Sequence, residues 1–84
     1  MPYVTKNDRS RLDNGGEAQT PGELNYVITK TVDAYLTQTP GNYANFNEVI
    51  GVLECAKLEL YRRVVAQYED TKIAENGDVY TTLE

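Results

Sequence analysis

The sequence contains no histidine and a single cysteine, and each scarcity argues against a class of protein. Without histidine the chain lacks the commonest general base and the usual activator of serine or cysteine nucleophiles, so we expect no enzyme. One cysteine cannot form a disulfide within the chain, and one thiolate makes a poor zinc site. We therefore expect no cofactor and no metal, and a structural role for Cys55.

Long apolar runs are also missing. The N-terminus has no apolar segment of signal-peptide length, and no stretch of about 18 apolar residues is present that could span a bilayer. We expect a soluble cytoplasmic protein without membrane contact, located in the host cytoplasm if it is viral. Basic residues are few, 8 against 13 acidic ones, for a net charge of −5. Because duplex DNA is bound mainly through lysine and arginine, we expect no duplex nucleic acid as a partner.

The chain has 84 residues, which is enough for one small domain. A domain of this size buries only about 60–65% of the surface that its unfolded chain exposes, so its core is marginal. Since neither a disulfide nor a metal is available to stabilise it, self-association is the remaining source of stability. We therefore expect a homo-oligomer.

The first part of the chain is poor in apolar side chains. Residues 5–20 mix charged residues, asparagine and glycine, with only Leu12 and Ala18 as apolar groups. Such a segment has little surface to bury in return for becoming ordered. We interpret residues 1–19 as a flexible N-terminal arm that precedes a domain formed by residues 20–84.

A strong helix start follows this arm. Thr20 is a suitable N-cap, Pro21 fits the first helical position, and Glu23 lies three residues after the cap, as in a capping box. Apolar residues then recur every four positions, at Leu24, Ile28, Val32 and Leu36. This spacing predicts a helix over about 21–37.

A longer helix is predicted over about 43–75. It begins at Asn42 or Asn45, and Asn76-Gly77 ends it. Its apolar residues spread over two faces, so we predict an all-α fold in which a helical hairpin packs into a homo-oligomer. A strict seven-residue repeat through Phe46, Leu53 and Leu60 fails at Gln67, so the sequence predicts no coiled-coil seam.

The most distinctive polar cluster lies on this long helix. Glu59 precedes Arg62 and Arg63 by three and four residues, the spacing of ion pairs on a solvated helix face. The same two guanidiniums, next to the phenol of Tyr61, also suit a phosphate and a stacked base. Both interpretations stay open at this point.

Tyrosine is the second unusual feature, since the chain has seven tyrosines and one phenylalanine. An apolar ring with a polar tip suits ligand walls and interfaces as well as half-buried positions. Tyr26 lies off the main apolar stripe and is the strongest candidate, and Tyr80 belongs to an Asn-Gly ending that terminates a helix or contacts a ligand. The candidate ligand-binding residues are Asn25, Tyr26, Lys57, Tyr61, Arg62, Arg63 and Tyr80.

Two segments of the sequence resemble a known family. They are GELNYVITK at residues 22–30 and NFNEVIGVLECAKLELYRRVVAQYEDTKIAENGDVY at residues 45–80. They are similar to a family of small helical proteins of unknown function from phages and bacteria. The resemblance implies a helical hairpin and a viral origin. It also implies more helix ahead of the first hairpin helix than the composition of residues 1–19 predicts.

Two functions are consistent with these observations. The first is a non-enzymatic oligomeric binding protein that sequesters a small phosphorylated ligand, by analogy with the sponges through which phages trap the cyclic nucleotide signals of bacterial defence. Arg62 and Arg63 would neutralise phosphates, and Tyr26, Tyr61 or Tyr80 would stack on bases. The alternative is an acidic helical module that binds a host or phage protein through the spare apolar face of the long helix.

Overall fold

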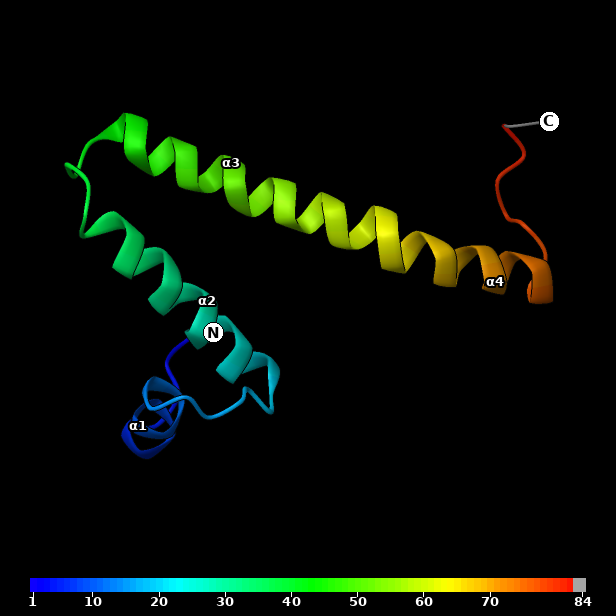
Figure 1. Ribbon diagram of the computed structural model, residues 1–84. Coiled ribbons are helices and arrows are strands. Elements are labelled where there is room, and N and C mark those ends of the chain that lie inside the picture. The colour runs from blue at the N-terminus through cyan, green and yellow to red at the C-terminus, as the bar shows by residue number, and fades with distance from the viewer. Residues whose placement is uncertain (83–84) are drawn as a thin grey trace. The chain divides into compact units, whose positions relative to one another are not determined.

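The computed structural model describes residues 1–82, and every element of regular secondary structure in this range is a helix (Figure 1). In chain order these are α1 (Lys6–Asp13), α2 (Pro21–Leu36), α3 (Tyr43–Leu60), the π-helical turn η1 (Tyr61–Val65) and α4 (Ala66–Asn76). Residues 1–82 contain no strand, which confirms the all-α prediction. The chain divides into two compact units, Met1–Asn47 and a second that begins at Glu48.

Helix α1 lies where the composition predicted a flexible arm. Thr5 caps it, because its hydroxyl accepts a hydrogen bond from the backbone N–H of Asp8 at 3.2 Å. Leu12, near its end, is buried, and Gly15 follows in a positive-φ conformation of 93°. The composition-based interpretation was wrong for these residues, because the Thr5 cap and the buried Leu12, together with side-chain contacts to α2, order a short helix. The helical content implied by the family resemblance is present.

Helix α2 begins as its sequence predicts. The Thr20 hydroxyl accepts a hydrogen bond from the Glu23 backbone N–H at 3.1 Å, and Pro21 occupies the first turn. The Glu23 carboxylate does not return to the cap residue itself. It accepts from the backbone N–H of Gln19 at 3.0 Å, one residue earlier than an ideal capping box. The helix ends at Leu36, within one residue of the expected boundary.

The long helical run starts and stops at the predicted signals. Of the two predicted starts, Asn42 is the cap, because its side-chain oxygen accepts from the backbone N–H of Asn45 at 3.0 Å. At the other end Gly77 has a φ of 88°, and its N–H bonds to the Ile73 carbonyl at 2.8 Å. A residue with a side chain would be strained in that backbone conformation, so the Asn-Gly pair ends α4.

The interruption of this run at η1 was not predicted. The backbone N–H of Ala66 bonds to the carbonyl of Tyr61, five residues back, so the turn holds one residue more than an α-helical turn. The apolar pattern predicted a continuous α-helix over 43–75. Hydrophobic periodicity does not reveal such an insertion, because one extra residue merely rotates the pattern that follows it.

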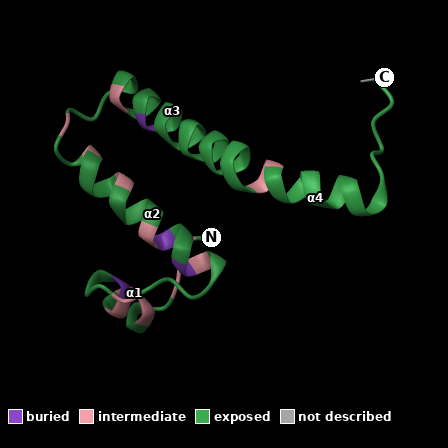
Figure 2. Cartoon of the chain, turned by 45° about the vertical axis from the view of Figure 1, so that its right-hand side comes forward, coloured by how far each residue is buried: buried purple, intermediate pink, exposed green. Residues whose placement is uncertain are grey.

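Burial differs strongly along the chain (Figure 2). The first unit buries Leu12, Glu23 and Tyr26 where α1 meets α2. In the second unit Val49 is buried and Val65 is half-buried, while the other large apolar side chains of its helices are exposed. None of the helices described in residues 1–82 is long and apolar enough to cross a membrane.

Candidate functional site

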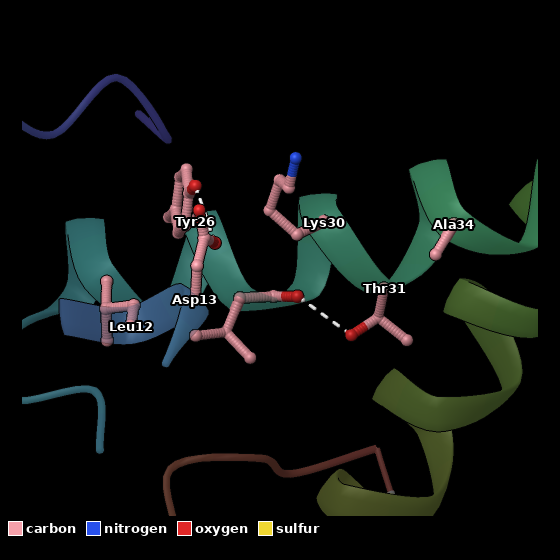
Figure 3. A pocket seen from close by; sticks show the side chains of 7 residues that line it. Leu12, Asp13, Tyr26, Lys30, Thr31 and Ala34 are labelled. Carbon is pink, nitrogen blue, oxygen red and sulfur yellow. Dashed lines mark hydrogen bonds between the residues drawn. The ribbon is translucent and has the colours of Figure 1, made fainter. Parts of the chain in front are cut away.

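Tyr26, the strongest tyrosine candidate of the sequence, lies between α1 and α2 and is only 7% exposed. Its phenol donates a hydrogen bond to the Asp13 carboxylate at 2.8 Å (Figure 3). The Arg9 guanidinium lies 5.9 Å from its ring centre. Burial raises the pKa of the Tyr26 phenol above 10.0, and the hydrogen bond to Asp13 raises it further. Tyr26 is therefore a neutral donor that fastens the end of α1 to α2.

A second polar contact joins the same two helices. The Arg11 guanidinium, from α1, bonds to the Glu23 carboxylate in the first turn of α2, and it also donates to the Glu17 carbonyl at 2.8 Å. Glu23 is 7% exposed. The bond from Arg11 lowers the pKa of the Glu23 carboxyl below 4.5, and the backbone N–H of Gln19 lowers it further. The buried carboxylate is thus paired and remains charged at neutral pH.

A shallow hollow of about 390 Å³ opens beside Tyr26 (Figure 3). Its volume is within the range of small-molecule sites. However, three of the polar side chains that line it already make hydrogen bonds within the protein. The Asp13 carboxylate is engaged by Tyr26, and the Thr31 hydroxyl donates to the Val27 carbonyl at 2.9 Å. Lys30 makes no ion pair within residues 1–82. The lining residues are Leu12, Asp13, Tyr26, Val27, Lys30, Thr31 and Ala34.

The arginine pair lies on the π-helical turn of the second unit. Arg62 approaches the Glu59 carboxylate at 3.1 Å and Arg63 approaches the same carboxylate at 3.7 Å. The two guanidinium side chains are 72% and 68% exposed. Two positive charges share one negative charge, so this cluster keeps a positive excess on an otherwise acidic chain.

The pKa of Tyr61, which lies on the same turn, is affected by side chains that follow it in the sequence. The Glu69 carboxylate raises the pKa of the Tyr61 phenol above 10.0, and the phenol of Tyr80 makes a smaller contribution. The backbone N–H of Tyr80 donates to the Asp78 carboxylate at 2.9 Å. Tyr80 also lines a hollow of about 290 Å³ at the end of α4.

The predicted site residues fall into both units. Asn25 and Tyr26 belong to α2 in the first unit, where the Asn25 side-chain oxygen accepts from the Thr29 hydroxyl at 3.3 Å. Lys57 belongs to α3 in the second unit, where it pairs with Glu54 at 3.3 Å. The candidates that the second unit contains are Lys57, Tyr61, Arg62, Arg63 and Tyr80.

Sequence reasoning missed the partners of Tyr26. Arg9 and Asp13 were assigned to the flexible arm, and Lys30 was not a candidate although it lies one turn from Tyr26. A signal was present, because Thr5 followed by Asp8 three residues later has the spacing of a helix cap with an acidic first turn.

The family to which the chain belongs is shown by comparison with family models. Residues 1–79 match a domain of unknown function (DUF6899), so the match includes α1, the segment at residues 22–30 and all but the last residue of the segment at residues 45–80. The chain is a member of this family. No curated protein matches it, and no solved structure matches it.

Proposed function

We propose that this member of the family is a non-enzymatic, homo-oligomeric binding protein that sequesters a small phosphorylated ligand. The observation that carries the proposal is that the second unit exposes both apolar side chains and a pair of arginines. Its helical run displays large apolar side chains that no element of that unit covers, while a pair of arginines stands on the π-helical turn. The exposed large apolar residues of α3, η1 and α4 beyond Val49 are Ile50, Val52, Leu53, Leu58, Leu60, Tyr61, Val64, Tyr68 and Ile73.

The assembly part of the proposal follows from the cost of this exposure. Burying one such side chain stabilises a protein by about 1.5–3 kcal/mol, and soluble monomers seldom expose a continuous apolar surface of this kind. Other copies of the chain, and α2 of the same chain in a hairpin, are the surfaces that this proposal assigns to cover it. We include both in the proposal, as a helical hairpin that packs into a homo-oligomer.

The ligand part rests on the arginine pair. Because Arg62 and Arg63 share the Glu59 carboxylate, a phosphate can take over the free donors of both guanidiniums without breaking a buried contact. The exposed ring of Tyr61 offers a surface on which a base can stack. Lys57, one turn earlier, adds positive charge. A cyclic nucleotide, which joins phosphates to bases, combines these requirements.

Binding without turnover is the expected activity. Among residues 1–82 no set of side chains provides a base, a nucleophile and a charge stabiliser together, and the proposal is that the ligand is released unchanged. A protein of this kind acts as a sponge that lowers the free concentration of a signal. We propose a phage-encoded role of this kind, in the cytoplasm of the host.

A protein-interaction module is the second candidate. The net charge of −5 and the exposed apolar faces of α3 and α4 favour it, since both features suit a groove on a basic partner protein. It differs from the first candidate in its requirements, because it needs the apolar surface but not the arginines.

Isothermal titration with a panel of cyclic dinucleotides and trinucleotides tests the ligand part. We expect binding by the unmodified chain and a loss of at least tenfold in affinity in the double variant Arg62→Ala/Arg63→Ala. Lys72→Ala is the matched control, because it removes a cation that also forms an i,i+3 pair on the same helical run, with Glu75 at 3.2 Å. Absence of heat with every ligand would contradict the sponge and favour the interaction module.

A further inference from the structure

The chain contains two Asn-Gly pairs, and each lies at the C-terminal end of a helix. Asn14-Gly15 ends α1, and Asn76-Gly77 ends α4. Both glycines have a positive φ, 93° for Gly15 and 88° for Gly77, a conformation that strains residues with a side chain. The two pairs therefore have the same local role, and neither candidate function of the chain uses either asparagine.

An Asn-Gly pair is also chemically labile, because asparagine can react with the residue that follows it. The backbone nitrogen of the glycine attacks the side-chain carbonyl carbon of the asparagine, and a C–N bond forms. The side-chain nitrogen leaves as ammonia and takes up the proton that the glycine nitrogen gives up. Water then opens the five-membered imide to an aspartate or an isoaspartate. Glycine permits the attack because it has no side chain to hinder its nitrogen.

A helical hydrogen bond opposes this reaction at both pairs. The Gly77 N–H bonds to the Ile73 carbonyl at 2.8 Å, and the Gly15 N–H bonds to the Leu12 carbonyl at 3.1 Å. A nitrogen that is engaged in this way must be released before it can attack. The rate at each pair therefore depends on how readily its helix end opens.

The end of α1 is held by several side chains. The Asn14 side-chain amide, which is the group that would react, donates to the Ser10 carbonyl at 2.7 Å. The residue before it, Asp13, accepts from the Tyr26 phenol at 2.8 Å, and Leu12 is buried against α2. Opening of this end therefore breaks tertiary contacts as well as helical hydrogen bonds.

The end of α4 has no comparable support among residues 1–82. The Asn76 side chain makes no hydrogen bond there. Every residue from 67 to 82 is exposed. Within the second unit α4 contacts only η1, the turn that precedes it in the same helical run. Opening of its last turn therefore breaks helical hydrogen bonds without exposing a buried side chain, and helix ends of this kind open readily.

We propose that Asn76 is a site of spontaneous deamidation, and that the packing of α1 protects Asn14 from the same reaction. The reaction consumes water and needs no enzyme. Its product places a carboxylate at a helix C-terminus, where negative charge is unfavourable, in a hollow that Asp78 and Tyr80 also line. The end of α4 thus becomes more acidic with time. This inference does not depend on the proposed ligand or assembly.

Incubation of the full chain at neutral pH, followed by digestion and mass spectrometry, tests the proposal. The mass of each peptide shows whether its asparagine amide has become a carboxylate. We expect Asn76 to convert at least tenfold faster than Asn14 in the folded chain. In concentrated denaturant, which frees both glycine nitrogens, the two rates should agree within threefold. Equal rates in the folded chain, faster conversion of Asn14, or an unreactive Asn76 would overturn the proposal.

A pair of variants tests the cause of the difference. Leu12→Ala removes the buried side chain that holds α1, so it should speed conversion of Asn14 at least fivefold and leave that of Asn76 within twofold. Leu24→Ala is the matched control, because Leu24 is exposed on α2, and it should change neither rate by more than twofold. An unchanged rate at Asn14 in Leu12→Ala, or equal rates there in the two variants, would show that packing does not protect Asn14.

Discussion

The two units of the chain show two ways in which a short sequence is held together. In the first unit side chains from different elements meet, as Tyr26 meets Asp13 and Arg11 meets Glu23. In the second unit the ion pairs of the helical run join residues three or four apart, such as Lys57 with Glu54. Contacts of the first kind fix one element against another, whereas contacts of the second kind only support the helix that contains them.

The difference has an energetic consequence. An exposed pair at this spacing stabilises a helix by about 0.2–0.5 kcal/mol, far less than the burial of one leucine. The helical run of the second unit is therefore supported by local ion pairs but has almost no buried core. Tertiary packing normally supplies most of the stability of a protein helix. Among the described residues, the first unit has such packing between α1 and α2.

The largest expected effect comes from removing the packing of the first unit. Leu12→Ala should destabilise the contact between α1 and α2 by about 2–3 kcal/mol, because Leu12 is 7% exposed. Hydrogen exchange of the amides in residues 6–13 measures it, and these amides should lose their protection. Leu24→Ala is the control, since Leu24 is exposed on α2. Equal losses in the two variants would mean that α1 is not held by Leu12.

The next effect concerns the charge pair of the first unit and depends on pH. The pKa of Glu23 is lowered by Arg11, so its contribution to stability is present above pH 4.5 and is lost as the pH falls through the lowered value. Arg11→Ala should abolish most of this dependence and destabilise the unit less than Leu12→Ala. Thermal unfolding at pH 7 and pH 3 measures both effects. An unchanged pH dependence in the variant would contradict the role of Arg11.

Much of this architecture follows from the sequence, and the exceptions have physical causes. The caps at Thr20, Asn42 and Gly77 were readable because capping depends on one or two neighbouring residues. Helix α1 was missed because its stability depends on Leu12 packing against a helix distant in sequence. The π-helical turn was missed because the apolar pattern is compatible with either register.

The candidate site was predictable to a similar extent. The closeness of Arg62 and Arg63 to Glu59 follows from helical spacing alone. The burial of Tyr26 does not, because it requires Asp13 from a segment that composition assigned to an arm. Local features of a site are therefore readable in this sequence, and those that depend on tertiary contacts are not.

Two glycine variants test the quality of the second unit's helix, with opposite expected signs. Gly51→Ala, inside α3, should raise helix stability by about 0.5–1 kcal/mol, since nothing lies within 4 Å of the added carbon. Gly77→Ala should lower it by about 1–2 kcal/mol, because its φ of 88° disfavours a side chain. Circular dichroism during thermal unfolding measures both. A gain in both variants would mean that Gly77 does not determine the end of α4.

The smallest effects concern the titration of one tyrosine in each unit. The pKa values of Tyr26 and Tyr61 are both raised, but burial is the main cause for Tyr26 and the Glu69 carboxylate is the main cause for Tyr61. Glu69→Gln should therefore return the pKa of Tyr61 most of the way toward 10.0, whereas Asp13→Asn should leave that of Tyr26 raised. NMR detection of the ring carbon next to the phenol oxygen follows each tyrosine separately. If the pKa of Tyr26 instead returned to its ordinary value in Asp13→Asn, the Asp13 carboxylate rather than burial would be the main cause of its shift. The two units would then differ in the number of buried side chains but not in the cause of the tyrosine pKa shift.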